Sequence, residues 1–219
     1  MNFQVFVDSF WKILLPGLKV TLPLTAVSFS LAMVIATITA LIQFAEIKVL
    51  KELARIYIWI IRGTPLLVQL FVVFYGLPSV GIIIDAIPAA IIVFSINEGA
   101  YCAETMRGAL ESIPKGQIEA GYCVGMNYVQ IMWRIVLPQA LRVAFPSLFN
   151  SLISLVKDTS LASNITVTEM MMQTRMINAR NYEALTLYLE VALIYLIFST
   201  VLTYVQRWGE KKLSSYGKQ

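Results

Sequence analysis

The stretch PKGQIEAGYCVGMNYVQIMWRIVLP, residues 114–138, is the longest part of the chain without an apolar run of membrane-spanning character. It has the pattern of two short helices joined by a glycine. Pro114 stands where the first turn of a helix tolerates proline, and residues 115–124 favour a helix. Gly125 favours the left-handed conformation that commonly ends a helix. The stretch therefore predicts a helical docking loop outside the membrane.

The second helix of this loop has a predicted start and end. Asn127 is a candidate N-cap, and Gln130, three residues later, completes the pattern of a capping box. An apolar run follows, and Pro138 is expected to stop the helix. The loop is therefore expected to finish at residue 138, before the next membrane span begins.

The first helix of the loop offers a carboxylate, Glu119, beside two residues small enough for another backbone to approach closely, so a partner is expected there. The spacing resembles the E-A-A, three residues, G, nine residues, I-x-L-P loop of ABC importer permeases, and the matching residues are Glu119, Ala120, Gly121, Gly125, Ile135, Leu137 and Pro138. Gly121 replaces the commonest third residue by another small one. The resemblance implies that this loop couples the chain to an ATPase. The alternative is a surface hairpin that only connects two spans.

The composition is that of a polytopic membrane protein. Of the 219 residues, 58% are hydrophobic and only 14% are charged, and the mean hydropathy is +0.73. We expect a single membrane domain over residues 1–219, without a cleavable signal peptide.

The net charge of +4 is better explained by membrane orientation than by nucleic-acid binding. Cys102 and Cys123 lack metal-ligand spacing and histidine is absent, so no metal site is expected.

Five apolar stretches predict an all-α protein with about five transmembrane helices, over residues 18–44, 66–77, 87–109, 140–156 and 184–205. Residues 51–62 predict a helix at the membrane interface, which Pro65 interrupts. The segment RGTPLLVQ, residues 62–69, resembles one found in the polar amino-acid branch of these permeases. Residues 161–182 are ambiguous, with a half-buried helix closing the outer side as one solution. Residues 206–219 are expected to be a polar basic tail.

The distribution of basic residues predicts the orientation. Twelve lie on the side of the docking loop and the C-terminus, and four on the other: Lys48, Lys51, Arg55, Arg62, Arg107, Lys115, Arg134, Arg142, Arg207, Lys211, Lys212 and Lys218, against Lys12, Lys19, Arg175 and Arg180. Basic residues are enriched on the cytoplasmic side of a membrane. We therefore expect a multi-pass protein of the cell membrane with its N-terminus outside and its C-terminus in the cytoplasm.

The chain lacks the G-x-x-x-x-G-K-[ST] loop that cradles nucleotide phosphates, so ATP and Mg²⁺ are expected on a separate ATPase, and the chain itself is not expected to be an enzyme. Five spans are few for a solute pathway, which favours a second permease copy, identical or related.

Over nearly the whole chain the sequence resembles the membrane subunit of an ABC importer for polar amino acids. The resemblance implies ATP-binding subunits, an extracytoplasmic solute-binding protein and alternating access. An ion-coupled secondary transporter and a non-transporting membrane anchor are the alternatives.

Polar residues within two of the spans predict a solute site. Ionisable groups inside a membrane usually face protein, water or cargo, because exposing them to lipid is costly. One stripe follows the third span and another follows the fourth, and the candidate solute-binding residues are Asn97, Glu98, Tyr101, Ser154 and Asp158. The carboxylates of Glu98 and Asp158 would suit the ammonium group of any amino acid, and together they favour one with a basic side chain. The alternative is structural pairing, of Glu104 with Arg107 and of Asp158 with a nearby Lys or Arg.

Overall fold

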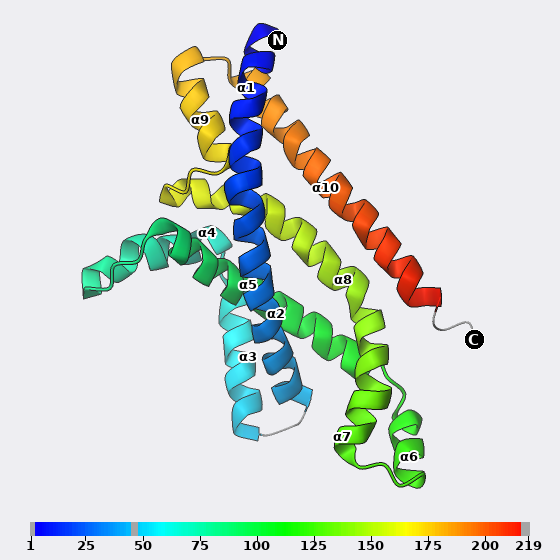
Figure 1. The fold of residues 1–219 in the computed structure, drawn as a ribbon. Helices are drawn as coiled ribbons and strands as arrows, with labels where there is room; N and C mark the ends of the chain where they lie inside the picture. The colour runs from blue at the N-terminus through cyan, green and yellow to red at the C-terminus, as the bar shows by residue number, and fades with distance from the viewer. Residues whose placement is uncertain (1–2, 45–47, 216–219) are drawn as a thin grey trace.

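The computed structural model describes residues 3–44 and 48–215, and these residues form helices and connecting loops without a β-strand (Figure 1). The predicted all-α architecture is confirmed. The α-helices are α1 (Phe3–Pro16), α2 (Leu22–Phe44), α3 (Lys48–Gly63), α4 (Leu66–Phe71), α5 (Ala86–Glu111), α6 (Lys115–Cys123), α7 (Tyr128–Ile131), α8 (Leu137–Asp158), α9 (Met170–Asn181) and α10 (Ala184–Ser215). In this part of the chain, four helical stretches are long and apolar enough to cross a membrane, and a bent pair provides a fifth.

The helix that contains the first predicted span begins much earlier than residue 18. A π-helical turn, Gly17–Thr21, joins α1 to α2, and residues Gln4–Phe44 form one helical stretch of 41 residues. At 1.5 Å per residue this stretch is about 60 Å long, twice the roughly 30 Å thickness of a bilayer core. One end of it must therefore project beyond the membrane.

The projecting part belongs to an outer bundle made by α1, α9 and the start of α10, at the top of Figure 1. Its buried side chains are Ile13, Met170, Leu187, Val191 and Ile194. Two buried carboxylates add polar contacts: Ser9 Oγ donates to Glu190 Oε2 at 2.5 Å, and Glu169 accepts hydrogen bonds from the Met172 amide and the Tyr195 hydroxyl, each at 2.8 Å. Burial raises the pKa of Glu169. The ambiguous residues 161–182 thus contain α9, capped by Glu169 at its N-terminus.

The predicted second span falls within a bent pair of helical segments, residues 48–63 and 66–80, whose axes differ by 101°. The bend lies at Gly63-Thr64-Pro65, where the prediction placed the interruption, because Pro65 takes an extended conformation and begins α4. On α3, Tyr57 donates from its hydroxyl to the carbonyl of Ile96 at 2.6 Å, and this contact connects α3 to α5.

The helix that contains Pro138 does not end there, which corrects the predicted stop. A π-helical turn, Met132–Val136, precedes the proline, and the Leu137 amide donates to the Met132 carbonyl five residues back. Pro138 then occupies the first turn of α8, where its missing N–H is tolerated. The result is a single helical stretch, Tyr128–Ile165, that runs from the docking loop through the membrane.

The last helix also continues past its predicted end. Residues through Ser215 extend α10, so residues 206–215 of the predicted polar basic tail are helical. Lys218, which contributed to the orientation prediction, lies outside the described residues. Toward its C-terminus α10 approaches α8, where Gln206 Nε2 donates to the carbonyl of Pro146 at 3.2 Å (Figure 1).

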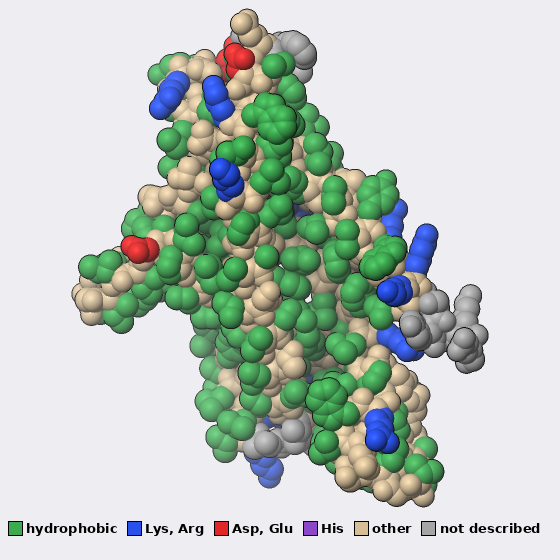
Figure 2. Space-filling view, viewed as in Figure 1, with side chains coloured by type: hydrophobic (Ala, Val, Ile, Leu, Met, Phe, Trp, Pro, Cys, Tyr) green, Lys and Arg blue, Asp and Glu red, His purple; other side chains and the backbone are tan. Residues whose placement is uncertain are grey.

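Small residues hold the centre of the molecule together. Ala36 and Ala40 of α2 and Ala100 and Ala103 of α5 are buried in one cluster, which is the close helix packing that small side chains permit in membranes. A second cluster lies around Phe94, and the outer bundle forms a third. Outside these clusters the visible surface is mostly apolar, as expected of a protein surrounded by lipid (Figure 2).

Candidate functional site

A polar cavity of about 550 Å³ lies between α5 and α8. All five candidate solute-binding residues line it, so the structure brings the two predicted stripes to one place. Its walls are formed by Leu66, Asn97, Glu98, Tyr101, Ser147, Asn150, Ser151, Ser154, Asp158 and Leu161. On α8, the residues at 147, 151, 154 and 158 are spaced by four, three and four, which places them on one helical face. Ser147 was missed in the sequence, although this spacing marks it.

Asn97 is held in place by the bend between α3 and α4. It is 7% exposed, and its Nδ2 donates to Gln69 Oε1 at 3.1 Å. Gln69 Nε2 in turn donates to the carbonyl of Ile61 and to Thr64 Oγ1, each at 2.8 Å. Gln69 therefore bridges the two sides of the bend and orients a cavity residue. Sequence reasoning missed this role, although Gln69 lies in the segment RGTPLLVQ.

Glu98 and Asp158 are the charged groups of the cavity wall. Glu98 is 7% exposed and accepts a weak hydrogen bond from Cys102 Sγ at 3.7 Å. Among residues 3–44 and 48–215, neither carboxylate forms an ion pair with Lys or Arg. The predicted structural pairing of Asp158 is therefore not found in the described residues. Both carboxylates face the cavity, where they are positioned to accept hydrogen bonds from a cation.

Glu104 has the structural pairing that its position predicted. Arg107 Nε lies 2.7 Å from Glu104 Oε1, and Arg107 Nη1 lies 2.6 Å from Glu111 Oε2. Arg62 reaches the same carboxylate from α3, with Nη1 3.4 Å from Glu104 Oε2. Its guanidinium carbon lies 5.1 Å above the ring of Tyr101. Sequence reasoning missed the contribution of Arg62, because it depends on the packing of α3 against α5.

The docking loop has the predicted local geometry. Gly125 has φ +80°, the Met126 amide donates to the Gly121 carbonyl, and the Gly125 amide donates to the Tyr122 carbonyl, the pattern of a Schellman C-terminus. Asn127 and Gln130 exchange both hydrogen bonds of a capping box. The two predicted helix boundaries at the centre of the loop are thus confirmed.

Gly121 serves the loop's own packing, which changes the interpretation of the small residues. It is buried, and a Cβ built on it would lie 2.8 Å from Ile131 Cγ1 and 3.3 Å from Ile135 Cδ1. Glu119 and Ala120 are exposed on the other side of α6. Gly121 therefore allows α6 to approach the second helix of the loop, and Glu119 and Ala120 are the residues that a partner can contact.

The remaining loop candidates lie where the loop meets α8. Leu137 is half-buried and Pro138 is exposed at the start of that helix. Gln139 Nε2 donates to Gln117 Oε1 and to the carbonyl of Ile135, which connects α6 to α8. In the described residues no group of three His, Cys, Asp or Glu side chains is arranged to hold a metal ion.

Known proteins are similar to this chain in sequence and fold. Residues 32–215 match the family described as "Binding-protein-dependent transport system inner membrane component". The L-cystine transport system permease protein TcyB of Bacillus subtilis (strain 168) is 46% identical over 210 residues, which cover 95% of this chain and 90% of TcyB. The arginine transport system permease protein ArtQ of the same organism is 32% identical, covering 92% of this chain and 93% of ArtQ.

A solved structure agrees with these relatives. A crystal structure of an amino acid ABC transporter with histidines superposes on this chain with a TM-score of 0.90 and 30% sequence identity, covering 97% of this chain and 99% of the other. Because the family match, the relatives and the fold coincide over nearly all of the chain, the protein belongs to the binding-protein-dependent transport system inner membrane component family, as the permease subunit of an amino-acid ABC importer.

Proposed function

We propose that the polar cavity between α5 and α8 holds an amino acid with two cationic groups during transport. The supporting observation is that Glu98 and Asp158 line one cavity without an ion pair to Lys or Arg in the described residues. An ionised side chain at the bilayer centre costs about 2.5–3.5 kcal/mol on insertion scales. A dicationic solute offsets that cost by pairing with both carboxylates.

A basic amino acid fits this requirement through its α-ammonium group and its cationic side chain. A second candidate is cystine, because a permease named for L-cystine is 46% identical to this chain. Cystine carries two ammonium groups, so it meets the same two carboxylates. The neutral side chains of the wall, Asn97, Asn150 and Ser154, offer donors to the solute carboxylate.

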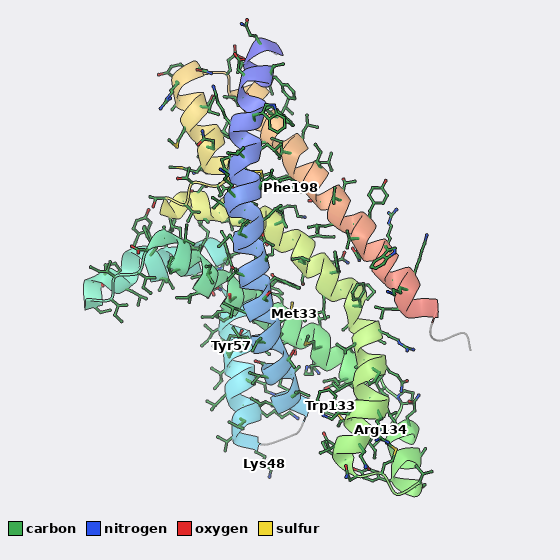
Figure 3. The ribbon with its side chains drawn as sticks, viewed as in Figure 1. Met33, Lys48, Tyr57, Trp133, Arg134 and Phe198 are labelled. Carbon is green, nitrogen blue, oxygen red and sulfur yellow. The ribbon has the colours of Figure 1, made fainter. Side chains whose placement is uncertain are left out.

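The chain acts in this proposal with several partners. A second permease copy, identical or related, completes the path, and a solute-binding protein delivers cargo to the outer end. Separate ATP-binding subunits, which carry ATP and Mg²⁺, dock on α6 through Glu119 and Ala120. The basic end of the molecule faces the cytoplasm: Lys48 of α3 and Arg134 beside α7 lie at the same end (Figure 3).

The test compares uptake in vesicles that contain the complete transporter. Glu98→Gln and Asp158→Asn preserve shape and remove one charge each. We expect each to raise the apparent KM for the transported cation about tenfold or more, because a hydrogen bond to a charged group contributes about 1.5–3 kcal/mol. Assembly and basal ATP hydrolysis should persist. Glu52→Gln is the matched control, since Glu52 pairs with Arg55 outside the cavity.

The uptake assay should use arginine, lysine, histidine and cystine, with a neutral amino acid as a comparison. A KM unchanged by both cavity substitutions, with transport of the neutral amino acid alone, would show that the two carboxylates are structural. Uptake that continues without the ATPase would instead favour an ion-coupled transporter. Absence of any uptake by the complete complex would favour a membrane anchor.

A further inference from the structure

A second polar cavity follows the first along α5. It has a volume of about 370 Å³ and is lined by Gln43, Lys51, Arg55, Ile58, Trp59, Glu104, Arg107 and Glu111. Asn97 and Tyr101 of α5 line the first cavity, and Glu104, Arg107 and Glu111 line the second. These positions recur every three or four residues, so a single polar stripe of α5 passes from one cavity to the other.

The opposite wall of the second cavity is the polar face of α3. Lys51 and Arg55 line the cavity, while the apolar side chains Val49, Leu53, Ile56 and Ile60 are exposed on the outside of the same helix. The helix is amphipathic with its polar face toward α5. In a membrane protein this arrangement keeps water on the inner side of the helix and lipid on the outer side.

One buried group in this cavity has no partner. Gln43 of α2 is 6% exposed, and its Nε2 lacks a hydrogen-bond acceptor in the described residues. The side chain lines the second cavity. A solute carboxylate passing through the cavity would supply the acceptor that Gln43 lacks.

The boundary between the two cavities consists of Arg62, Tyr101 and Glu104. Tyr101 belongs to the wall of the first cavity and Glu104 to that of the second, and Arg62 contacts both from the end of α3. Arg62 is also the last basic residue before the 101° bend. A rotation of α3 about this bend would therefore move the guanidinium relative to α5.

The distances show which member of this cluster is released most easily. Arg107 makes two contacts with Glu104, at 2.7 and 3.3 Å, whereas Arg62 makes one at 3.4 Å. The side chain of Arg62 is 41% exposed and that of Glu104 is 29% exposed, so solvent screens their attraction. When Arg62 leaves, Arg107 still neutralises Glu104, and no buried charge is left unpaired.

We propose that Arg62, by pairing with Glu104 and stacking on Tyr101, closes the solute cavity toward a hydrated exit cavity between α3 and α5. This proposal rests on the proposed function, because it takes the first cavity as the solute site. Release of Arg62 opens the passage, and the transported amino acid then passes the unpartnered Gln43 amide and the Arg107 guanidinium on its way to the cytoplasm. Arg62 is thus a gating residue and not a binding residue.

The test measures access to the first cavity from the cytoplasmic side. A thiol is introduced by Ser151→Cys, since Ser151 lines that cavity, in a chain that also carries Cys102→Ser and Cys123→Ser. Inside-out vesicles containing the complete transporter, without nucleotide, receive a membrane-impermeant cationic methanethiosulfonate. We expect Arg62→Ala to speed modification about tenfold, from the loss of both the ion pair and the cation–π contact, and Glu104→Gln to speed it about threefold, from the loss of the ion pair alone.

Two controls separate gating from general disruption. Arg180→Ala removes an exposed basic residue of α9 that lines neither cavity and should leave the rate within about twofold of the parent. The double variant Arg62→Ala/Glu104→Gln should be no faster than Arg62→Ala, because both changes remove one contact. Modification that is equally fast in the parent and in both boundary variants would overturn the gate.

The same thiol distinguishes this inference from the proposed function. Arginine or cystine added at saturating concentration should slow modification if the first cavity holds solute. Protection by solute together with no effect of Arg62→Ala would reject the gate and keep the solute site. Acceleration by Arg62→Ala without protection by any amino acid would keep the gate and reject the solute assignment.

Discussion

Replacing Gln69 by Met should destabilise the bend between α3 and α4 and weaken solute binding together. Methionine keeps the length of the side chain but cannot bond to Ile61, Thr64 or Asn97. Each lost hydrogen bond contributes about 0.5–1.5 kcal/mol, and partial exposure of the site places the total near 2 kcal/mol. For a chain of this size that loss lowers Tm by about 4–8 °C.

Thermal unfolding of the purified complex in detergent measures the fall in Tm. Uptake kinetics measure the weaker solute binding. The apparent KM should rise while the uncoupled ATPase activity persists, because Asn97 loses the partner that orients it in the cavity. Gln173→Met is the control, since Gln173 makes no side-chain hydrogen bond among the described residues. If Tm falls by less than about 1 °C and KM stays unchanged, the bridge across the bend carries none of the stability argued here.

Three further predictions concern orientation and the docking loop. An impermeant thiol reagent added outside should label Ser79→Cys and spare the exposed Cys123 of α6 in a Cys102→Ser chain; labelling of Cys123 alone would reverse the orientation. Glu119→Lys should reduce co-purification of the ATP-binding subunits, whereas Glu183→Lys near α10 at the opposite end should not; equal co-purification in both would leave the loop as a connector. Gly121→Leu should destabilise the loop by about 1–3 kcal/mol through overpacking against Ile131, seen as faster proteolysis at residues 114–138; unaltered proteolysis would contradict the tight packing.

Most of the helical architecture could be predicted from local chemistry. Gly125, Asn127 and Gln130 have fixed geometric requirements, so their spacing identified the turn and the capping box. The helical residues before the first predicted span were missed because Lys12, Pro16 and Lys19 interrupt the apolar run there, whereas packing of α1 against α9 and α10 sustains the helix. Pro138 was misjudged because a π-helical turn removes the need for its N–H.

The site was predictable where it depends on helical spacing and unpredictable where it depends on the bend. The stripes of α5 and α8 follow from three-to-four periodicity, and the structure places them in one cavity. The contacts of Gln69 require the 101° change of direction, whose angle no local pattern specifies, and those of Arg62 require the packing of α3 against α5. Gly121 was assigned to a partner's approach because sequence alone does not tell which face of α6 is covered by Ile131.

The unbroken helical stretch from Tyr128 to Ile165 has a mechanical consequence. At one end it carries the docking loop, and near the other it carries Ser154 and Asp158 of the cavity. A helix transmits axial force with little compression, because each turn is cross-linked by hydrogen bonds along the direction of the load. A push on α6 and α7 therefore arrives at the cavity wall as a displacement of the whole helix, and the π-helical turn before Pro138 and the proline at position 146 are places where the helix can bend.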